Sequence, residues 1–178
     1  MAGKRLSAYL VGIQHVFQLG RKNATATAIE YSNSLWCSRL SNIEKLTETG
    51  LTGAYHTVQH FISDSPWDSR ELMDISSNEA SRLMPQRKLT GLYIDETGVR
   101  KKGEHSVGVG RQYLGSIGKV DNGQVAVCAA LGSGDFATIV DSRLYLPESW
   151  TGDKVRMNKV KIPKEYQVFK TKQQLALD

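Results

Sequence analysis

The spacing of hydrophobic residues changes near the middle of this chain, and that change limits the folds it can adopt. After Pro85 the apolar residues fall in short runs rich in β-branched side chains, which is typical of strands. Together with the polar residues that follow it, Pro85 predicts two domains, 1–85 and 86–178. We therefore expect an α+β fold in which a helical region precedes a sheet. In the first domain apolar residues recur three or four apart, as in a helix: Leu6, Leu10, Ile13 and Phe17.

Local signals divide the first domain into four or five short helices. Asn23 and Thr52 are candidate N-caps, because their side-chain oxygens can accept a hydrogen bond from a helix N-terminus. Gly20 and Gly50 are candidate helix ends. Pro66 separates the last two helical segments of this domain.

Two histidines of the first domain, His56 and His60, lie four residues apart on one helical face. This spacing could supply half of a metal site. The glutamate of the HExxH motif is absent between them, so histidines on a helix surface or in contact with phosphate fit the sequence better.

The second domain predicts three antiparallel strands, at residues 89–94, 124–131 and 136–146. The last two are joined at 132–135, where glycines tolerate the positive φ of a hairpin turn. Residues 97–123 are rich in glycine and basic residues, and we expect them to form a long functional loop.

Composition limits the cell compartment and the partner. The formal net charge of +5 favours a polyanionic partner, although many basic proteins bind none. The two cysteines lie far apart and predict neither a zinc site nor a disulfide framework. Residues 6–19 are too short and too polar for a membrane span, and the sequence shows no signal-peptide cleavage site. We therefore expect a cytoplasmic protein that does not enter a membrane.

An acidic pair, Asp95 and Glu96, follows the apolar residues 92–94. We expect those residues to form a buried strand, with Asp95 emerging where the strand leaves the core and reaching a divalent cation. Neighbouring residues of a strand point to opposite faces, so Glu96 is a poor second ligand. The alternative is that the acidic residues only close the strand and cap a turn.

Several separated blocks of the second domain, taken in order, resemble the DDE transposases of bacterial insertion sequences. The resemblance extends back to residues 59–68 and implies an RNase H-like fold with Asp95 as the first catalytic aspartate. Such enzymes hold two Mg²⁺ or Mn²⁺ ions between three carboxylates and cut and join DNA strands. The blocks are residues 93–97, 101–103, 105–113, 118–119, 121–124 and 143–147.

The resemblance also implies which residues meet double-stranded DNA at transposon ends and in the target. Tyr113 or Trp67 could stack on an exposed base, and Asn122 and Gln124 match family positions that either touch DNA or shape the hairpin. The ordinary alternative for each of these residues is a solvated loop charge or a core aromatic ring. The basic residues that could neutralise phosphates are Arg100, Lys101, Lys102, Arg111 and Lys119.

The chain departs from the family pattern at its end, Asp178, where no complete carboxylate triad has appeared. We therefore expect the N-terminal part of an RNase H-like mixed sheet, cut short, with an exposed edge that could pair two copies. The leading hypothesis is a transposase segment, in which residues 1–85 form a helical region that contacts DNA and residues 86–178 the N-terminal part of an RNase H-like catalytic domain. The alternative is a non-catalytic DNA-binding or regulatory fragment that occupies transposon ends or pairs with full-length transposase. A basic structural protein with no DNA role is a third possibility, and it requires the ordered blocks to be accidental.

Overall fold

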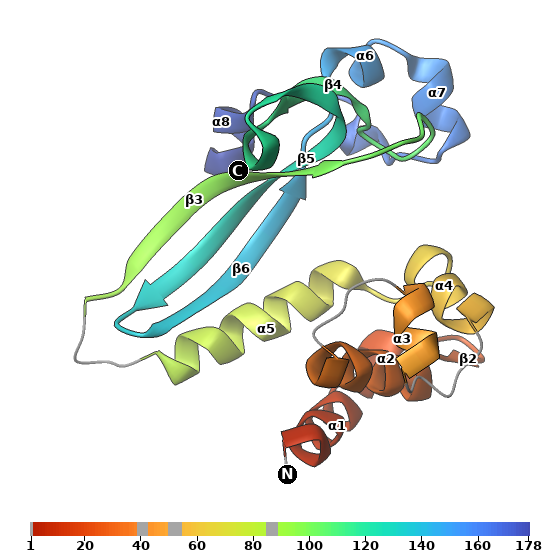
Figure 1. The fold of residues 1–178 in the computed structure, drawn as a ribbon, viewed down its shortest axis with the longest axis vertical. Helices are drawn as coiled ribbons and strands as arrows, with labels where there is room; N and C mark the ends of the chain where they lie inside the picture. The colour runs from red at the N-terminus through yellow and green to blue at the C-terminus, as the bar shows by residue number, and fades with distance from the viewer. Residues whose placement is uncertain (1, 39–42, 50–54, 85–88) are drawn as a thin grey trace. The chain divides into compact units, whose positions relative to one another are not determined.

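The computed structural model describes residues 2–38, 43–49, 55–84 and 89–178. Its chain forms two compact units, Met1–Leu72 and Met73–Asp178. Helices come first and an antiparallel sheet follows, which confirms the predicted α+β order (Figure 1). The boundary predicted after residue 85 lies outside the described residues and stays a prediction.

Five α-helices precede the large sheet in the described ranges, which confirms the expected number. Between the first two helices the chain makes a single 3-10 turn, η1 (Gln14–Phe17), and a small hairpin of β1 (Gln18–Leu19) and β2 (Lys22–Asn23). The helix that begins in the first unit and continues into the second is α5. The five helices are α1 (Ala2–Gly12), α2 (Thr25–Ser38), α3 (Ile43–Thr49), α4 (Tyr55–Ser63) and α5 (Ser69–Leu83).

Most of the predicted helix boundaries in the first unit can be checked. The Oδ1 atom of Asn23 accepts from the backbone N–H of Thr25 at 2.9 Å, so this cap is confirmed. The prediction that Gly20 ends a helix is wrong: Gly20 has a φ of +58° and makes the turn between β1 and β2, where glycine avoids steric strain. Pro66 separates α4 from α5 as expected. Gly50 and Thr52 lie outside the described residues.

The second unit contains an antiparallel sheet whose centre is the long strand β5. β3 pairs with one edge of β5 along its whole length, from Gly91 opposite Gly132 to Arg100 opposite Gly123. Gly123 also pairs with Gly110 of β4, so β4 lies on the other edge, and β6 continues along that edge. The strands are β3 (Gly91–Arg100), β4 (Gly110–Leu114), β5 (Lys119–Ser133) and β6 (Phe136–Leu144).

The hairpin between β5 and β6 is confirmed, because Ser133 pairs with Phe136 and Gly134 adopts a φ of +60° between them. The single long loop expected at 97–123 is wrong. β3 continues to Arg100, β4 and a 3-10 turn, η2 (Gly115–Ile117), follow, and β5 begins at Lys119. Pairing with β5 provides hydrogen-bond partners for the backbone of these strands. The loop that remains between β3 and β4 runs only from 101 to 109.

Beyond the sheet, the chain makes four short helical segments. Trp150 is fully buried with Val109 and Met157, and its indole Nε1 donates to the carbonyl of Val109 at 2.7 Å. This small core fixes the end of the 101–109 loop against the helices. The segments are α6 (Glu148–Thr151), α7 (Lys154–Lys159), η3 (Lys164–Tyr166) and α8 (Lys172–Leu177).

A β-bulge between β5 and β6 connects the sheet to α5. The pairing shifts between Ala129, opposite Asp141, and Ala130, opposite Ile139, so Val140 is the extra residue. Its carbonyl accepts a hydrogen bond from the hydroxyl of Ser77 in α5. No helix within the described ranges is both long enough and apolar enough to cross a membrane.

Candidate functional site

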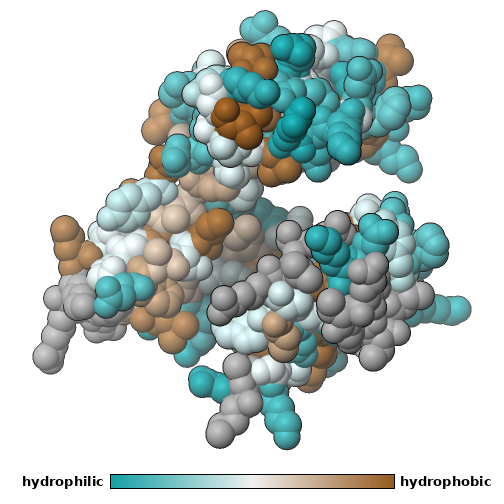
Figure 2. All heavy atoms as spheres, viewed as in Figure 1, coloured by the Kyte–Doolittle hydropathy of each residue, from teal (hydrophilic) through white to brown (hydrophobic). Residues whose placement is uncertain are grey.

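Asp95 lies in the middle of β3, with five strand residues beyond it, rather than at the strand end that the sequence predicted. The preceding residues are also not buried: Leu92 is 60% exposed, Tyr93 64% and Ile94 45%. A strand is buried on both faces only where a layer packs against each of them, and residues 92–94 are not enclosed in this way. Figure 2 accordingly shows pale and brown atoms at the surface of the sheet region.

Alternation along β3 places Asp95 and Glu96 on opposite faces of the sheet, as the sequence predicted. We name these the Asp95 face and the Glu96 face. Asp95 is exposed and stands directly opposite Cys128 of β5, which in turn stands opposite Ser142 of β6. Directly opposite residues of paired strands share a face, so these three side chains form one row. Cys128 Sγ and Ser142 Oγ are 3.5 Å apart within it.

The last helix packs against the part of the Glu96 face that surrounds Glu96. Glu96 forms an ion pair with Lys172, the first residue of α8. A small hollow on this face is lined by Ile94 and Val127 of the sheet and by Leu175 of α8. Both acidic residues are exposed, but the carboxylate of Glu96 is used in holding α8 to the sheet and that of Asp95 is not.

Two of the predicted phosphate-binding residues, Arg100 and Lys119, lie on the Glu96 face and converge on Asp121. Arg100 Nε is 3.0 Å and Lys119 Nζ 3.9 Å from Asp121 Oδ2. The backbone N–H of Asn122 donates to Asp121 Oδ1 at 2.8 Å and lowers the pKa of Asp121. The cations of Arg100, Lys119 and Arg111 lower that pKa further.

Asp121 is a residue whose role the sequence interpretation missed. Only part of the signal was present: Lys119 and Asp121 are two apart and would share a face of a strand, but the sequence predicted a loop here, and Arg100 is brought near only by the register of β5 with β3. Because its carboxylate already neutralises part of their charge, Arg100 and Lys119 offer less positive potential to DNA than their number suggests.

The amides of Asn122 and Gln124 hold the loop at 101–109. Asn122 Nδ2 donates to the carbonyl of Lys101 at 2.9 Å and to that of Gly103 at 3.0 Å. Gln124 Nε2 donates to the carbonyl of Val107. The sequence left open whether these side chains touch DNA or shape the hairpin. Their amide nitrogens are used in holding the loop, which agrees with the structural alternative. The loop they hold carries Lys102, which is exposed.

Arg111 and Tyr113 of β4 are exposed and lie on the Asp95 face. Arg111 stands opposite Asn122, six residues along β5 from Cys128 and therefore about 20 Å from the row that contains Asp95. Tyr113, 53% exposed, stands opposite Val120, two residues farther. The structure thus brings these two predicted residues to the same face as Asp95, but not next to it.

The described residues do not by themselves fit a two-metal centre. Asp95 Oδ1 accepts from the backbone N–H of Glu96 at 2.8 Å, and Cys128 and Ser142, the row's other members, are not carboxylates. In the described ranges no three His, Cys, Asp or Glu side chains gather where they could hold a metal ion. Asp95 supplies one hard oxygen ligand, and a pair of divalent ions needs several.

Comparisons with known proteins place the chain in a family. A probable transposase for insertion sequence element IS701, from Microchaete diplosiphon, is 43% identical over 70 residues, which are 39% of this chain and 18% of that transposase. No solved structure matches the chain significantly. The sequence profile of the DDE superfamily endonucleases matches residues 16–178. Since this match covers most of both units, and the order of helices and antiparallel strands agrees with it, the chain belongs to the DDE superfamily of endonucleases.

Proposed function

We propose that this chain is part of a DNA transposase that cuts and joins DNA strands at the ends of an insertion sequence. The observation that carries the proposal is the family match over residues 16–178. The matched residues include Asp95, an exposed aspartate on a sheet face that solvent can reach. The likeness of part of the chain to the transposase from Microchaete diplosiphon supports the same activity.

Asp95 is proposed as a catalytic residue that contributes one oxygen to a divalent metal site. Endonucleases of this superfamily depend on divalent metal ions, and Mg²⁺ or Mn²⁺ is the ion proposed here. When bound, such ions stabilise the charge that develops at a phosphodiester during its displacement. The open face supports this role for Asp95, whereas the ion pair of Glu96 with Lys172 argues against Glu96 as a second ligand.

Double-stranded DNA is the proposed partner, and the predicted residues take different parts in binding it. Arg111 and Lys102 are exposed cations that can neutralise phosphates, and Tyr113 offers an exposed ring for stacking. Asn122 and Gln124 are positioning residues, because they hold the loop that carries Lys102. We propose weaker DNA contacts for Arg100 and Lys119, since Asp121 pairs with both.

A nicking assay on supercoiled plasmid tests the proposal. The protein is the in-frame gene product that contains these residues, with and without Asp95→Asn, in the presence of Mg²⁺ or Mn²⁺. We expect metal-dependent nicking by the unchanged protein and a loss of at least a hundredfold with Asp95→Asn, while duplex binding is retained. The substitution removes the negative charge of the Asp95 carboxylate and leaves the cations that can neutralise phosphates in place. Nicking at an undiminished rate by the variant would remove Asp95 from the reaction.

A regulatory role without catalysis is the second candidate. It is favoured by the row that contains Asp95, in which Cys128 and Ser142 add no carboxylate. In this role the chain occupies transposon ends or pairs with full-length transposase and blocks it. Mixing the chain with an active transposase separates the two candidates, because a regulatory chain lowers the nicking rate in proportion to its concentration.

A further inference from the structure

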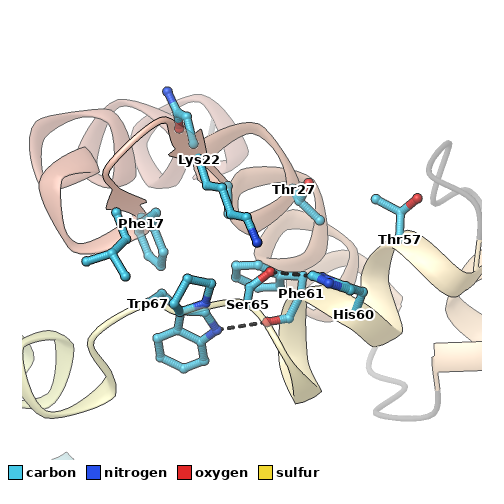
Figure 3. A pocket seen from close by; sticks show the side chains of 12 residues that line it. Phe17, Lys22, Thr27, Thr57, His60, Phe61, Ser65 and Trp67 are labelled. Atoms are coloured by element: carbon cyan, nitrogen blue, oxygen red, sulfur yellow. Dashed lines mark hydrogen bonds between the residues drawn. The ribbon is translucent and has the colours of Figure 1, made fainter.

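The first unit contains a hollow of about 180 Å³ that the candidate site does not include (Figure 3). Residues from the β1–β2 hairpin, the beginning of α2, α4 and the connection from α4 to α5 surround it. The volume is below the roughly 300–1,000 Å³ of pockets for drug-sized ligands, so it suits a group as small as a phosphate. The lining residues are Phe17, Leu19, Lys22, Asn23, Ala24, Thr27, Thr57, His60, Phe61, Ser65, Pro66 and Trp67.

Three aromatic rings form a fixed floor for this hollow. The rings of Phe61 and Trp67 are stacked, with centroids 5.8 Å apart and an interplanar angle of 20°. The ring centroid of Phe17 lies 6.3 Å from the centroids of both other rings. Trp67 Nε1 donates to the backbone carbonyl of Phe61 at 2.9 Å. Since Phe17 and Phe61 are also buried, the floor cannot easily collapse to fill the space above it.

One side of the hollow carries hydrogen-bond donors. Figure 3 shows the ammonium group of Lys22 extending into the hollow, toward the hydroxyl of Ser65 and the ring of His60. His60 Nδ1 and Ser65 Oγ are 3.2 Å apart, which joins these two side chains in one group. Thr27 and Thr57 also line the hollow, and Figure 3 shows the hydroxyl of Thr57 turned away from this group. None of the twelve described residues that line the hollow is acidic.

We propose that this hollow binds one phosphate group of the DNA backbone. The ammonium of Lys22, the imidazole of His60 and the hydroxyl of Ser65 can donate to one anion, and none of the lining residues carries a negative charge. The fourteen-residue helix α2 begins beside the hollow, at Thr25, and adds the positive end of its dipole. The assignment of the phosphate to DNA rests on the proposed function. It adds a DNA contact in the helical unit, separate from the sheet that carries Asp95.

The test is an anisotropy titration of the 178-residue chain with a labelled duplex at several salt concentrations. Each phosphate neutralised contributes about 0.9 to the slope of log K against log salt. We expect Lys22→Gln to lower that slope by about one. The matched control is Lys4→Gln, which removes the same charge from an exposed position of the same unit outside the hollow and should leave the slope unchanged. Replacing Ser65 with alanine removes the hydroxyl beside the Lys22 ammonium and should weaken binding several-fold.

Three results would overturn the proposal. The first is an unchanged slope for Lys22→Gln, and the second is an equal loss for Lys22→Gln and Lys4→Gln. The third comes from inorganic phosphate titrated into the ¹⁵N-labelled chain: if the amides of Thr27, Thr57 and Ser65 shift while Lys22→Gln leaves DNA binding unaffected, the hollow is a site for a free anion. If any of these results is obtained while nicking still depends on Asp95, only the phosphate site in the hollow is overturned and the proposed function stands. A chain that binds no duplex at any salt concentration overturns the DNA role as well.

Discussion

Replacement of Trp150 by phenylalanine should destabilise the second unit by about 2–5 kcal/mol. The indole Nε1 donates at 2.7 Å to the carbonyl of Val109, and phenylalanine would leave that buried acceptor without its partner, at about 1–3 kcal/mol. The ring is 0% exposed, so the smaller side chain also leaves a void worth roughly one or two methylene groups, about 0.8 kcal/mol each. The guanidinium of Arg156, 3.7 Å from the centre of the indole ring, loses part of its cation–π contact.

Urea unfolding followed by circular dichroism measures this loss, with Trp36→Phe as the matched control. Trp36 is 67% exposed on α2, so the same substitution there should change the free energy of unfolding by less than about 0.5 kcal/mol. A loss below about 1 kcal/mol for Trp150→Phe, no larger than that of the control, would refute the reasoning. It would mean that the buried indole does not hold the end of the 101–109 loop.

Three further predictions concern the sheet and its loop. Gly123→Ala should destabilise the second unit by about 1–3 kcal/mol in the same urea assay, since its Cβ would lie 2.7 Å from the backbone oxygen of Val99; an unchanged midpoint would contradict this. The lowered pKa of Asp121 predicts that its charged form, through the hydrogen bond from Asn122 and the ion pairs, stabilises the fold above the ordinary value of 3.8, and that this contribution disappears as pH falls through the lower folded value. Asp121→Asn should therefore remove part of the acid-induced loss of stability, and acid titrations of both proteins that superimpose would contradict it. Lys101→Ala with Lys102→Ala should lower the salt slope of duplex binding by up to about two, and an unchanged slope would exclude the loop from the DNA footprint.

The parts of the fold that local sequence determines were predicted correctly. Asn23 caps α2, Pro66 separates two helices and Gly134 turns the hairpin, because each depends on the conformational preference of one residue. The opposite orientation of Asp95 and Glu96 also follows from the alternation of side chains along any strand.

The parts that depend on distant segments were not predicted. Burial at residues 92–94 could not be predicted from their own hydrophobicity, because it depends on which elements pack over β3. The helix α8, which packs on part of one face, begins as far away as Lys172. The role of Asp121 required the register of β5 with β3, which brings Arg100 beside it. The 97–123 segment was interpreted as loop because its glycines hide strand alternation; in the structure Gly98 and Gly123 leave room for Leu114, which is 0% exposed.

The face of the sheet on which Asp95 lies determines the direction from which DNA could reach it. Asp95 is exposed on the face opposite to the one that α8 contacts, so on the proposed function a duplex has to approach the Asp95 face. Arg111 lies on that face about 20 Å along β5, a length that corresponds to roughly six base pairs of duplex. A contact at Arg111 would therefore fix the position of the DNA along the sheet without touching the phosphodiester at Asp95. This separation explains why Arg111 should affect binding strength, and Asp95 the chemical step.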